Sequence, residues 1–172
     1  MRLIDVLLAF PGLLLAIALV AVLGPDLRNT FLALCLIGWV GYARLSRAQA
    51  LALRQREFVS AARAAGAGTV RLVARHIVPN LLGPILVQAT LGVGGVIAAE
   101  ASLSFLGLGI QPPAASWGSM LRSGAQHLLD APHLALFPGL AIALLLLACA
   151  FVGDALAERL DPHRPPSSWS TP

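Results

Sequence analysis

Long apolar runs dominate the chain, and polar residues gather between these runs instead of alternating with apolar ones. The runs cover residues 6–23, 30–43, 81–99 and 134–152. A helix needs about 20 residues to cross about 30 Å of hydrocarbon. The first, third and fourth runs have that length, and the second reaches it if its helix starts at Leu27 or passes Arg44. The pattern predicts four membrane spans, at approximately 3–23, 27–45, 80–101 and 134–153.

The amino-acid composition also indicates a membrane protein. Apolar residues make up 58% of the 172 residues and charged residues 12%, against about 45–50% and about 25% in soluble domains. A cleavable signal peptide is the alternative for the first run, since Arg2 precedes it. That run is longer than the apolar core of a signal peptide, however, and another run follows closely. The expected fold class is all-α, a polytopic transmembrane helical bundle over residues 1–161.

The arginines indicate how the chain is oriented in the membrane. All twelve basic residues are arginine, and ten fall on one side of the predicted spans: Arg2, Arg44, Arg47, Arg54, Arg56, Arg63, Arg71, Arg75, Arg159 and Arg164. Arg28 and Arg122 fall on the other side. Because cytoplasmic connections are enriched in Lys and Arg, both termini and residues 44–79 are predicted to be cytoplasmic. The net charge of +4 then reflects topology, and nucleic-acid binding is not expected.

The arginine-rich segment 44–79 carries helix-forming residues as far as Arg63, which predicts a helix outside the bilayer. Gly66 and Gly68 should interrupt this helix, and Thr69 should cap a second, short one. Pro79 should close the segment before the third span.

Three other segments have a predicted structure: one lies within the first span and two lie outside the spans. Pro11 and Gly12 should kink the first span without necessarily breaking it. Residues 105–133 contain several glycines and prolines and are expected to form a structured external loop. Residues 162–172 combine proline with serine, which predicts a disordered cytoplasmic tail.

The chain lacks the groups that an ATPase or a redox enzyme requires. It has no lysine, so it cannot supply the Lys of a phosphate-binding P-loop. Cys35 and Cys149 lie inside apolar runs, where cysteine usually acts as a small hydrophobe, and they indicate neither a disulfide framework nor a metal site. ATP hydrolysis is therefore expected in partner subunits, and no cofactor is predicted.

The loop 105–133 contains residues that could form one of two kinds of site, a serine hydrolase site or a metal site. Ser119 with His127 or His133 could form part of a serine hydrolase, but no framework is recognisable that would bring a base and an orienting group to the serine. His127, Asp130 and His133 could bind a metal, but Pro132 interrupts their helical spacing. A solvated loop is favoured over both, so no catalytic or metal-binding residue is predicted.

Glu100 directly follows the third apolar run and falls inside the predicted span 80–101. Ionisable groups within spans are costly and usually face protein or water. Glu100 also lies about 20 residues beyond Pro79, which is enough to reach the outer interface. Two roles stay open: a pathway or gate residue, or an interfacial carboxylate hydrogen-bonded by Ser102 or Ser104.

The cytoplasmic segment carries the most specific motif. Ser60-Ala61-Ala62, then Gly66, then Val78-Pro79 keep the spacing of the E-A-A loop of ABC importer permeases, which this segment resembles. Ser60 replaces the first glutamate of that pattern, with Glu57 as an upstream acid, and His76 replaces an aliphatic residue. The resemblance assigns ATPase coupling to seven residues: Glu57, Ser60, Ala61, Ala62, Gly66, Val78 and Pro79.

Further blocks narrow the resemblance to permeases of dipeptide, oligopeptide and nickel importers. They extend from 42–44 to 161–162 and include residues 103–109, 111–113, 117–118 and 137–139. The resemblance implies a bacterial plasma (inner) membrane protein that pairs with a second permease subunit. It also implies two ABC ATPase subunits, an external substrate-binding protein and surrounding lipid as partners. The cargo it implies is a peptide or a related small solute.

The length of the chain departs from this family, which usually has six spans, and the first two spans of the family have no counterpart in this sequence. A non-transporting membrane scaffold or a truncated remnant of such a permease is therefore the alternative function. An ion-coupled secondary transporter would require more buried carboxylates or histidines than Glu100 offers.

Overall fold

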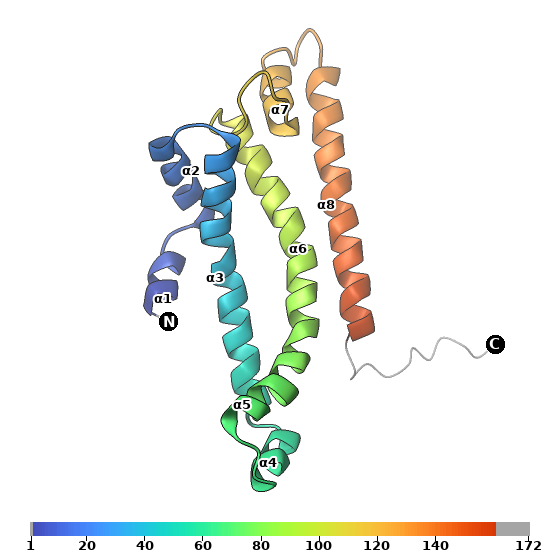
Figure 1. The fold of residues 1–172 in the computed structure, drawn as a ribbon. Coiled ribbons are helices and arrows are strands. Elements are labelled where there is room, and N and C mark those ends of the chain that lie inside the picture. Colours follow the sequence, from blue (N-terminus) through green and yellow to red (C-terminus); the bar gives the residue numbers. More distant parts are fainter. Residues whose placement is uncertain (1, 161–172) are drawn as a thin grey trace, which may run out of the picture.

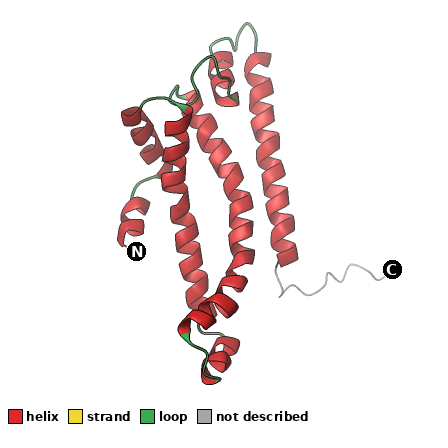
Figure 2. Cartoon of the chain, viewed as in Figure 1, coloured by secondary structure: helices red, strands yellow, loops and turns green. Residues whose placement is uncertain are grey.

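The computed structural model describes residues 2–160, which form an elongated assembly of helices without a strand in that range (Figure 1, Figure 2). The elements are α1 (Arg2–Leu8), α2 (Gly12–Leu23), α3 (Leu27–Leu53), α4 (Glu57–Ala64), α5 (Thr69–Leu72), the π-helical turn η1 (Val73–Ile77), α6 (Val78–Phe105), α7 (Trp117–Ala125) and α8 (His133–Leu160). The all-α prediction is confirmed. The predicted tail 162–172 lies outside the described residues.

Three helical stretches in the described part are long and apolar enough to cross a membrane: α3 with 27 residues, the continuous run Thr69–Phe105 with 37, and α8 with 28. The chain is therefore a multi-pass membrane protein. Within their most apolar windows only 11%, 11% and 6% of residues are buried inside the chain. Most of the side-chain surface of these helices must therefore face lipid or protein that lies outside this chain.

The first apolar run is broken rather than merely kinked. α1 and α2 meet at an angle of 89° across a short break, and they qualify as a span only as a pair. α1 ends where the Ala9 N–H donates to Asp5 O at 3.1 Å. Pro11 then takes an extended conformation, with φ −58° and ψ 123°, before α2 begins at Gly12. Because proline has no N–H to continue the helical ladder, the run 3–23 is not one continuous helix.

Small residues bring α6, α7 and α8 close together. A methyl group at Gly153 of α8 would lie 2.6 Å from Leu91 of α6, and one at Gly118 of α7 would lie 2.8 Å from the Cα of Ala101. Such contacts are typical of membrane helices, whose association depends on close packing. α7 lies beside the ends of α6 and α8, at the opposite end of the molecule from α4 (Figure 1).

The arginine-rich segment differs from its expected shape at three points. The helix expected from Arg44 to Arg63 is interrupted at residues 54–56, where α3 ends and α4 begins. Thr69 is the first residue of α5, whose N-cap is Gly68 without a side-chain cap. Pro79 does not close the segment, because the helix runs through it from Thr69 to Phe105.

The π-helical turn explains how the helix passes Pro79. The Val78 N–H donates to Val73 O, five residues back, so this turn is wider than an α-helical one. Pro79 directly follows this wider turn, as the second residue of α6. Asn80 Nδ2 then donates to His76 O at 2.7 Å and satisfies a carbonyl near the proline.

Candidate functional site: the coupling segment and the membrane cleft

The helix α4 presents a face of small residues to the outside. Val59 is 1% exposed and turns inward. Glu57, Ser60, Ala61 and Ala64 are all exposed, and their spacing of i, i+3, i+4 and i+7 places them on one stripe of the helix. Alanine and serine add little bulk, so the backbone of α4 can approach a partner surface closely along this stripe.

Gly66 ends α4 with a complete Schellman motif. Its φ is +83°, the left-handed region that glycine adopts without a β-carbon penalty. The Gly66 N–H donates to Arg63 O at 3.0 Å, and the Ala67 N–H donates to Ala62 O at 3.0 Å. These are the two hydrogen bonds that define the motif. The structural requirement for glycine at this position therefore comes from the backbone conformation.

Phe58 ties α4 to the π-helical turn. Its ring lies with its centroid 6.3 Å from that of His76, at an interplanar angle of 38°. Both distance and tilt are typical of paired rings. The contact crosses from α4 to the stretch that continues into the membrane helix α6. His76, the departure from the aliphatic residue of the E-A-A pattern, is thus the residue that receives this ring.

The structure brings five of the seven predicted coupling residues together and separates the other two. Glu57, Ser60, Ala61 and Ala62 lie on α4, and Gly66 follows its end. Ala62 is half-buried and lies off the exposed stripe. Val78 and Pro79 lie instead in the first turn of α6, where both are exposed. The residues that match the spacing of the E-A-A loop in the sequence therefore lie on two different helices, α4 and α6.

Glu100 lies near the far end of α6 and is held by a buried serine. Ser104 is 2% exposed, and its hydroxyl donates to Glu100 Oε1 at 2.6 Å. The same oxygen of Ser104 accepts the N–H of Ile110 at 3.2 Å. Ser102 donates instead to Ala98 O at 2.7 Å. Of the two serines considered from the sequence, Ser104 is thus the partner of Glu100.

A cleft of about 240 Å³ separates α2 and α3 from α6. Glycines open its walls: a methyl group at Gly38 or Gly95 would have no atom within 4 Å. Tyr42 and Gln88 supply its hydrogen-bonding side chains, and neither residue is charged. Neither residue is among the site residues that the sequence predicts. The sequence feature that could have identified them is a phenol and an amide placed among otherwise apolar positions of two predicted spans.

Ser119 and the nearby histidines form neither of the alternative sites that the sequence left open. Ser119 completes a capping box with Ser116 at the start of α7: the Ser119 N–H donates to Ser116 Oγ at 3.1 Å, and the Ser116 N–H donates to Ser119 Oγ at 3.1 Å. His127 contacts the carbonyl of Ser123 at 3.1 Å. Among residues 2–160 no group of three His, Cys, Asp or Glu side chains is placed to hold a metal ion.

Apolar spans around a neutral cleft, joined to an exposed helix outside the bilayer, define a polytopic membrane protein of the permease class. The chain belongs to the family described as "Binding-protein-dependent transport system inner membrane component", which matches residues 1–164. The family resemblance found in the sequence is thereby confirmed. This family is one of transport permeases and not of enzymes.

Curated relatives match almost the whole chain. It is 47% identical over 161 residues to the dipeptide transport system permease protein DppC of Alkalihalophilus pseudofirmus. It is 46% identical over 162 residues to the di/tripeptide transport system permease protein DppC of Pseudomonas aeruginosa, and 47% identical over 162 residues to the glutathione transport system permease protein GsiD of Escherichia coli. These matches cover 94% of this chain but 53–54% of each relative, so the chain spans about half the length of the relatives.

Proposed function

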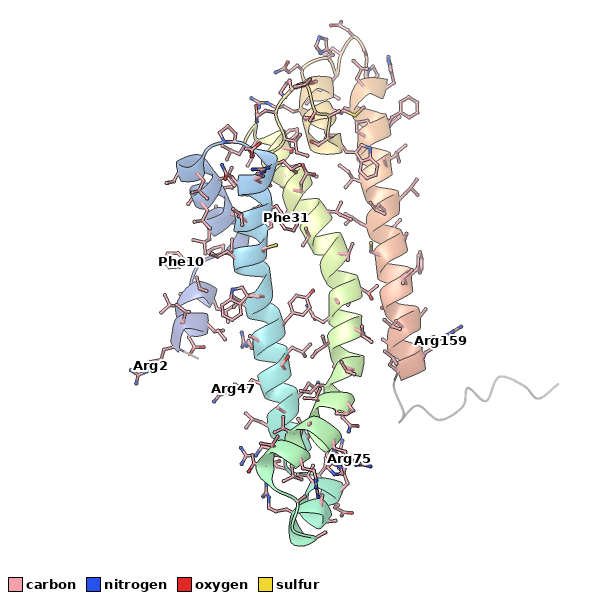
Figure 3. The ribbon with its side chains drawn as sticks, in the orientation of Figure 1. Arg2, Phe10, Phe31, Arg47, Arg75 and Arg159 are labelled. Carbon is pink, nitrogen blue, oxygen red and sulfur yellow. The ribbon has the colours of Figure 1, made fainter. Side chains whose placement is uncertain are left out.

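We propose that the chain is a membrane-spanning permease subunit of an ATP-driven ABC importer that carries peptides or a related small solute across the bacterial plasma membrane. Its relatives are named as dipeptide, di/tripeptide and glutathione transport permeases. Both termini and residues 44–79 face the cytoplasm in this proposal, in agreement with the arginine distribution. Arg47, Arg75 and Arg159 all lie toward the end of the molecule that holds α4 (Figure 3).

The observation that carries the proposal is the mechanical continuity between α4 and a membrane helix. Phe58 packs on His76, and His76 belongs to the helical run that continues from Thr69 to Phe105. A displacement of α4 by a partner can therefore be passed to α6 as the movement of a connected helix. Alternating access requires such a movement between two packings of the spans. Glu57, Ser60, Ala61, Ala62 and Gly66 form the docking helix and its cap, and Val78 and Pro79 form its connection to α6.

Two ABC ATPase subunits would supply that displacement, since the chain has no lysine for a P-loop of its own. A second permease subunit would cover helix surface that this chain leaves open, in particular α8, of which only 6% of the most apolar window is buried. An external substrate-binding protein would deliver the cargo. Purified alone, the chain should hydrolyse no ATP.

The cleft between α3 and α6 is suited to be this subunit's half of the path. Tyr42 and Gln88 offer a hydroxyl and an amide, which match the N–H and C=O groups of a peptide backbone. Among the described residues, no charged side chain lines the cleft. The cleft would therefore neither attract nor repel the charged side chains of different cargoes. Glu100 lies on the same helix beyond the cleft, and this proposal gives it the role of a pathway or gate residue. Its hydrogen bond from Ser104 is equally the one expected of an interfacial carboxylate, so the two roles stay open.

Bulk on the exposed face of α4 provides the test. Ala61→Leu and Ala64→Leu should reduce labelled dipeptide uptake by tenfold or more in cells that carry the chain together with its proposed partners, a second permease, the ATPase subunits and a binding protein. Ala52→Leu adds the same bulk at an exposed position near the end of α3 and serves as the matched control. Equal uptake by all three variants would contradict the docking role. Absence of uptake in the unsubstituted protein, with normal membrane abundance, would favour the alternative of a non-transporting scaffold or remnant.

A further inference from the structure

A second cavity lies between α1 and the last turns of α3. Its volume is about 550 Å³, more than twice that of the membrane cleft. Its lining combines apolar side chains with three charged ones: Ile4, Leu8 and Leu51 beside Asp5, Arg44 and Arg47. The proposed transport path does not use this cavity.

The length of α3 places the two arginines at the boundary of the hydrocarbon layer. The helix begins at Leu27, and at about 1.5 Å per residue Arg44 and Arg47 lie about 26 Å and about 30 Å along it. A bilayer has a hydrocarbon core of about 30 Å. Arg44 and Arg47 therefore reach the level of the lipid phosphates when Leu27 lies at the other surface. This placement depends on helix length alone and not on which side is cytoplasmic.

The guanidinium groups at this level are available for an anion. In the described part of the chain neither Arg44 nor Arg47 has a carboxylate partner, although Asp5 lines the same cavity. Both arginines are exposed. Arg2 extends from the start of α1 and Arg47 from α3, both on the side of the molecule where α1 lies (Figure 3). With two arginines against one aspartate, the cavity itself carries a net positive charge.

We infer that this cavity binds one anionic phospholipid, with its phosphate on Arg44 and Arg47 and an acyl chain against Leu8 and Leu51. Guanidinium groups bind phosphate oxygens through paired N–H donors. Basic pockets between membrane helices are suited to anionic lipid headgroups. The apolar half of the lining distinguishes a lipid from a free phosphate ion, which would gain nothing from Ile4, Leu8 or Leu51.

Binding of phosphatidylglycerol to the full 172-residue chain in phosphatidylcholine nanodiscs tests the inference. Native mass spectrometry would count retained lipid as the phosphatidylglycerol fraction is raised. Arg44→Gln with Arg47→Gln should weaken retention about 25-fold, since each arginine near an anionic surface contributes about fivefold. Asp5→Asn should strengthen retention, because it removes the one negative group of the cavity. Arg28→Gln with Arg159→Gln removes the same charge outside the cavity and should leave retention unchanged.

Each outcome decides the inference. Equal retention of phosphatidylglycerol and phosphatidylcholine would overturn it, as would displacement of the lipid by millimolar inorganic phosphate, which would identify a free-anion site. Unchanged retention in the Arg44/Arg47 double variant would also overturn it. If that variant does not fold, as judged by its circular dichroism and elution volume, Asp5→Asn decides alone, since it is a near-isosteric change at an exposed position. A protein partner that crosslinks to position 4 or 51 and excludes lipid would contradict the lipid assignment.

Discussion

Ser104 donates a 2.6 Å hydrogen bond to Glu100 from a position that is 2% exposed, so a buried hydroxyl orients the carboxylate near the C-terminal end of α6. The same serine accepts the N–H of Ile110, which lies beyond the end of the helix. One side chain therefore fixes both the carboxylate and the start of the loop that leads to α7. Orientation of Glu100 and folding of that loop are coupled through Ser104.

Ser104→Ala should lower thermal stability and disturb Glu100 together. The substitution leaves the Ile110 N–H and one carboxylate oxygen without their partner, at a cost of about 1–3 kcal/mol. Ser102→Ala is the matched control and should cost little, because Ser102 donates to the Ala98 carbonyl one turn back in its own helix, and this carbonyl lies within the backbone ladder of α6. The measurement is the apparent melting temperature in detergent. Equal falls in melting temperature in both variants would show that the hydrogen bonds of Ser104 contribute no more to stability than the single bond of Ser102.

Much of the membrane architecture could be predicted from apolar run length. The ranges predicted for the second, third and fourth spans each lie within or nearly within a long helix: α3, α6 and α8. What run length could not predict is where helices continue outside the bilayer. The stretch from Ser46 to Leu53 is too polar to count as a span but consists of good helix formers, so α3 extends to Leu53. The run through Pro79 was missed because proline was expected to end a helix, whereas a π-helical turn precedes Pro79 and the helix continues through it.

The small helix α7 shows a different limit of sequence reasoning. It lies inside the expected loop 105–133, and its start is marked by Ser116 and Ser119, three residues apart. This spacing is a capping signal, but Ser119 was considered as a nucleophile instead. The coupling role of residues 57–79 stays a prediction. Spacing alone predicted the chain break at Gly66, whereas the division of the motif between α4 and α6 depends on tertiary packing that spacing does not contain.

Gly118→Ala should loosen the contact between α7 and α6. The added methyl group would lie 2.8 Å from Ala101 Cα and 2.8 Å from Ser104 Cβ, so one helix must move. Overpacking of this kind costs about 1–3 kcal/mol. Gly95→Ala is the control, because a methyl group there meets nothing within 4 Å and alanine favours the helix. Melting temperature should fall for Gly118→Ala and stay or rise for Gly95→Ala; the reverse order would contradict the packing described for α7.

Cysteine labelling should locate residues 44–79 in the cytoplasm and the loop before α8 outside. In a background with Cys35→Ala and Cys149→Ala, Gln55→Cys should resist a membrane-impermeant maleimide in intact cells. Leu129→Cys should react, since Leu129 is 98% exposed. Leu129 is preferred to Ser116, whose hydroxyl caps α7. Labelling at position 55 with protection at position 129 would reverse the orientation and remove the basis for ATPase docking at α4.

Substitution of Gly66 and of Gly68 can be compared directly. The comparison distinguishes the effect of a left-handed backbone conformation from the effect of replacing any glycine in this segment. Gly66 has φ +83°, whereas Gly68 has φ −69°. A β-carbon at either position meets no atom within 4 Å, so within this chain only the backbone differs between them. Gly66→Val should cost about 1–2 kcal/mol in the left-handed conformation. Gly68→Val, the same substitution, should cost little, because β-branched residues adopt its extended conformation readily. Gly68→Ala is the smaller change used as the control for transport.

Transport should follow the same order if the cap of α4 positions the docking helix. Gly66→Val should lose the Schellman hydrogen bonds to Arg63 and Ala62 and reduce dipeptide uptake by tenfold or more, while Gly68→Ala stays near the unsubstituted level. Membrane abundance should be unchanged in both, because each position lies outside the apolar spans. Co-purification of the ATPase subunits would show whether uptake is lost through docking. Normal uptake and normal ATPase association in Gly66→Val would exclude the α4 cap as part of the coupling element, whereas loss of the protein from the membrane would trace the defect to folding.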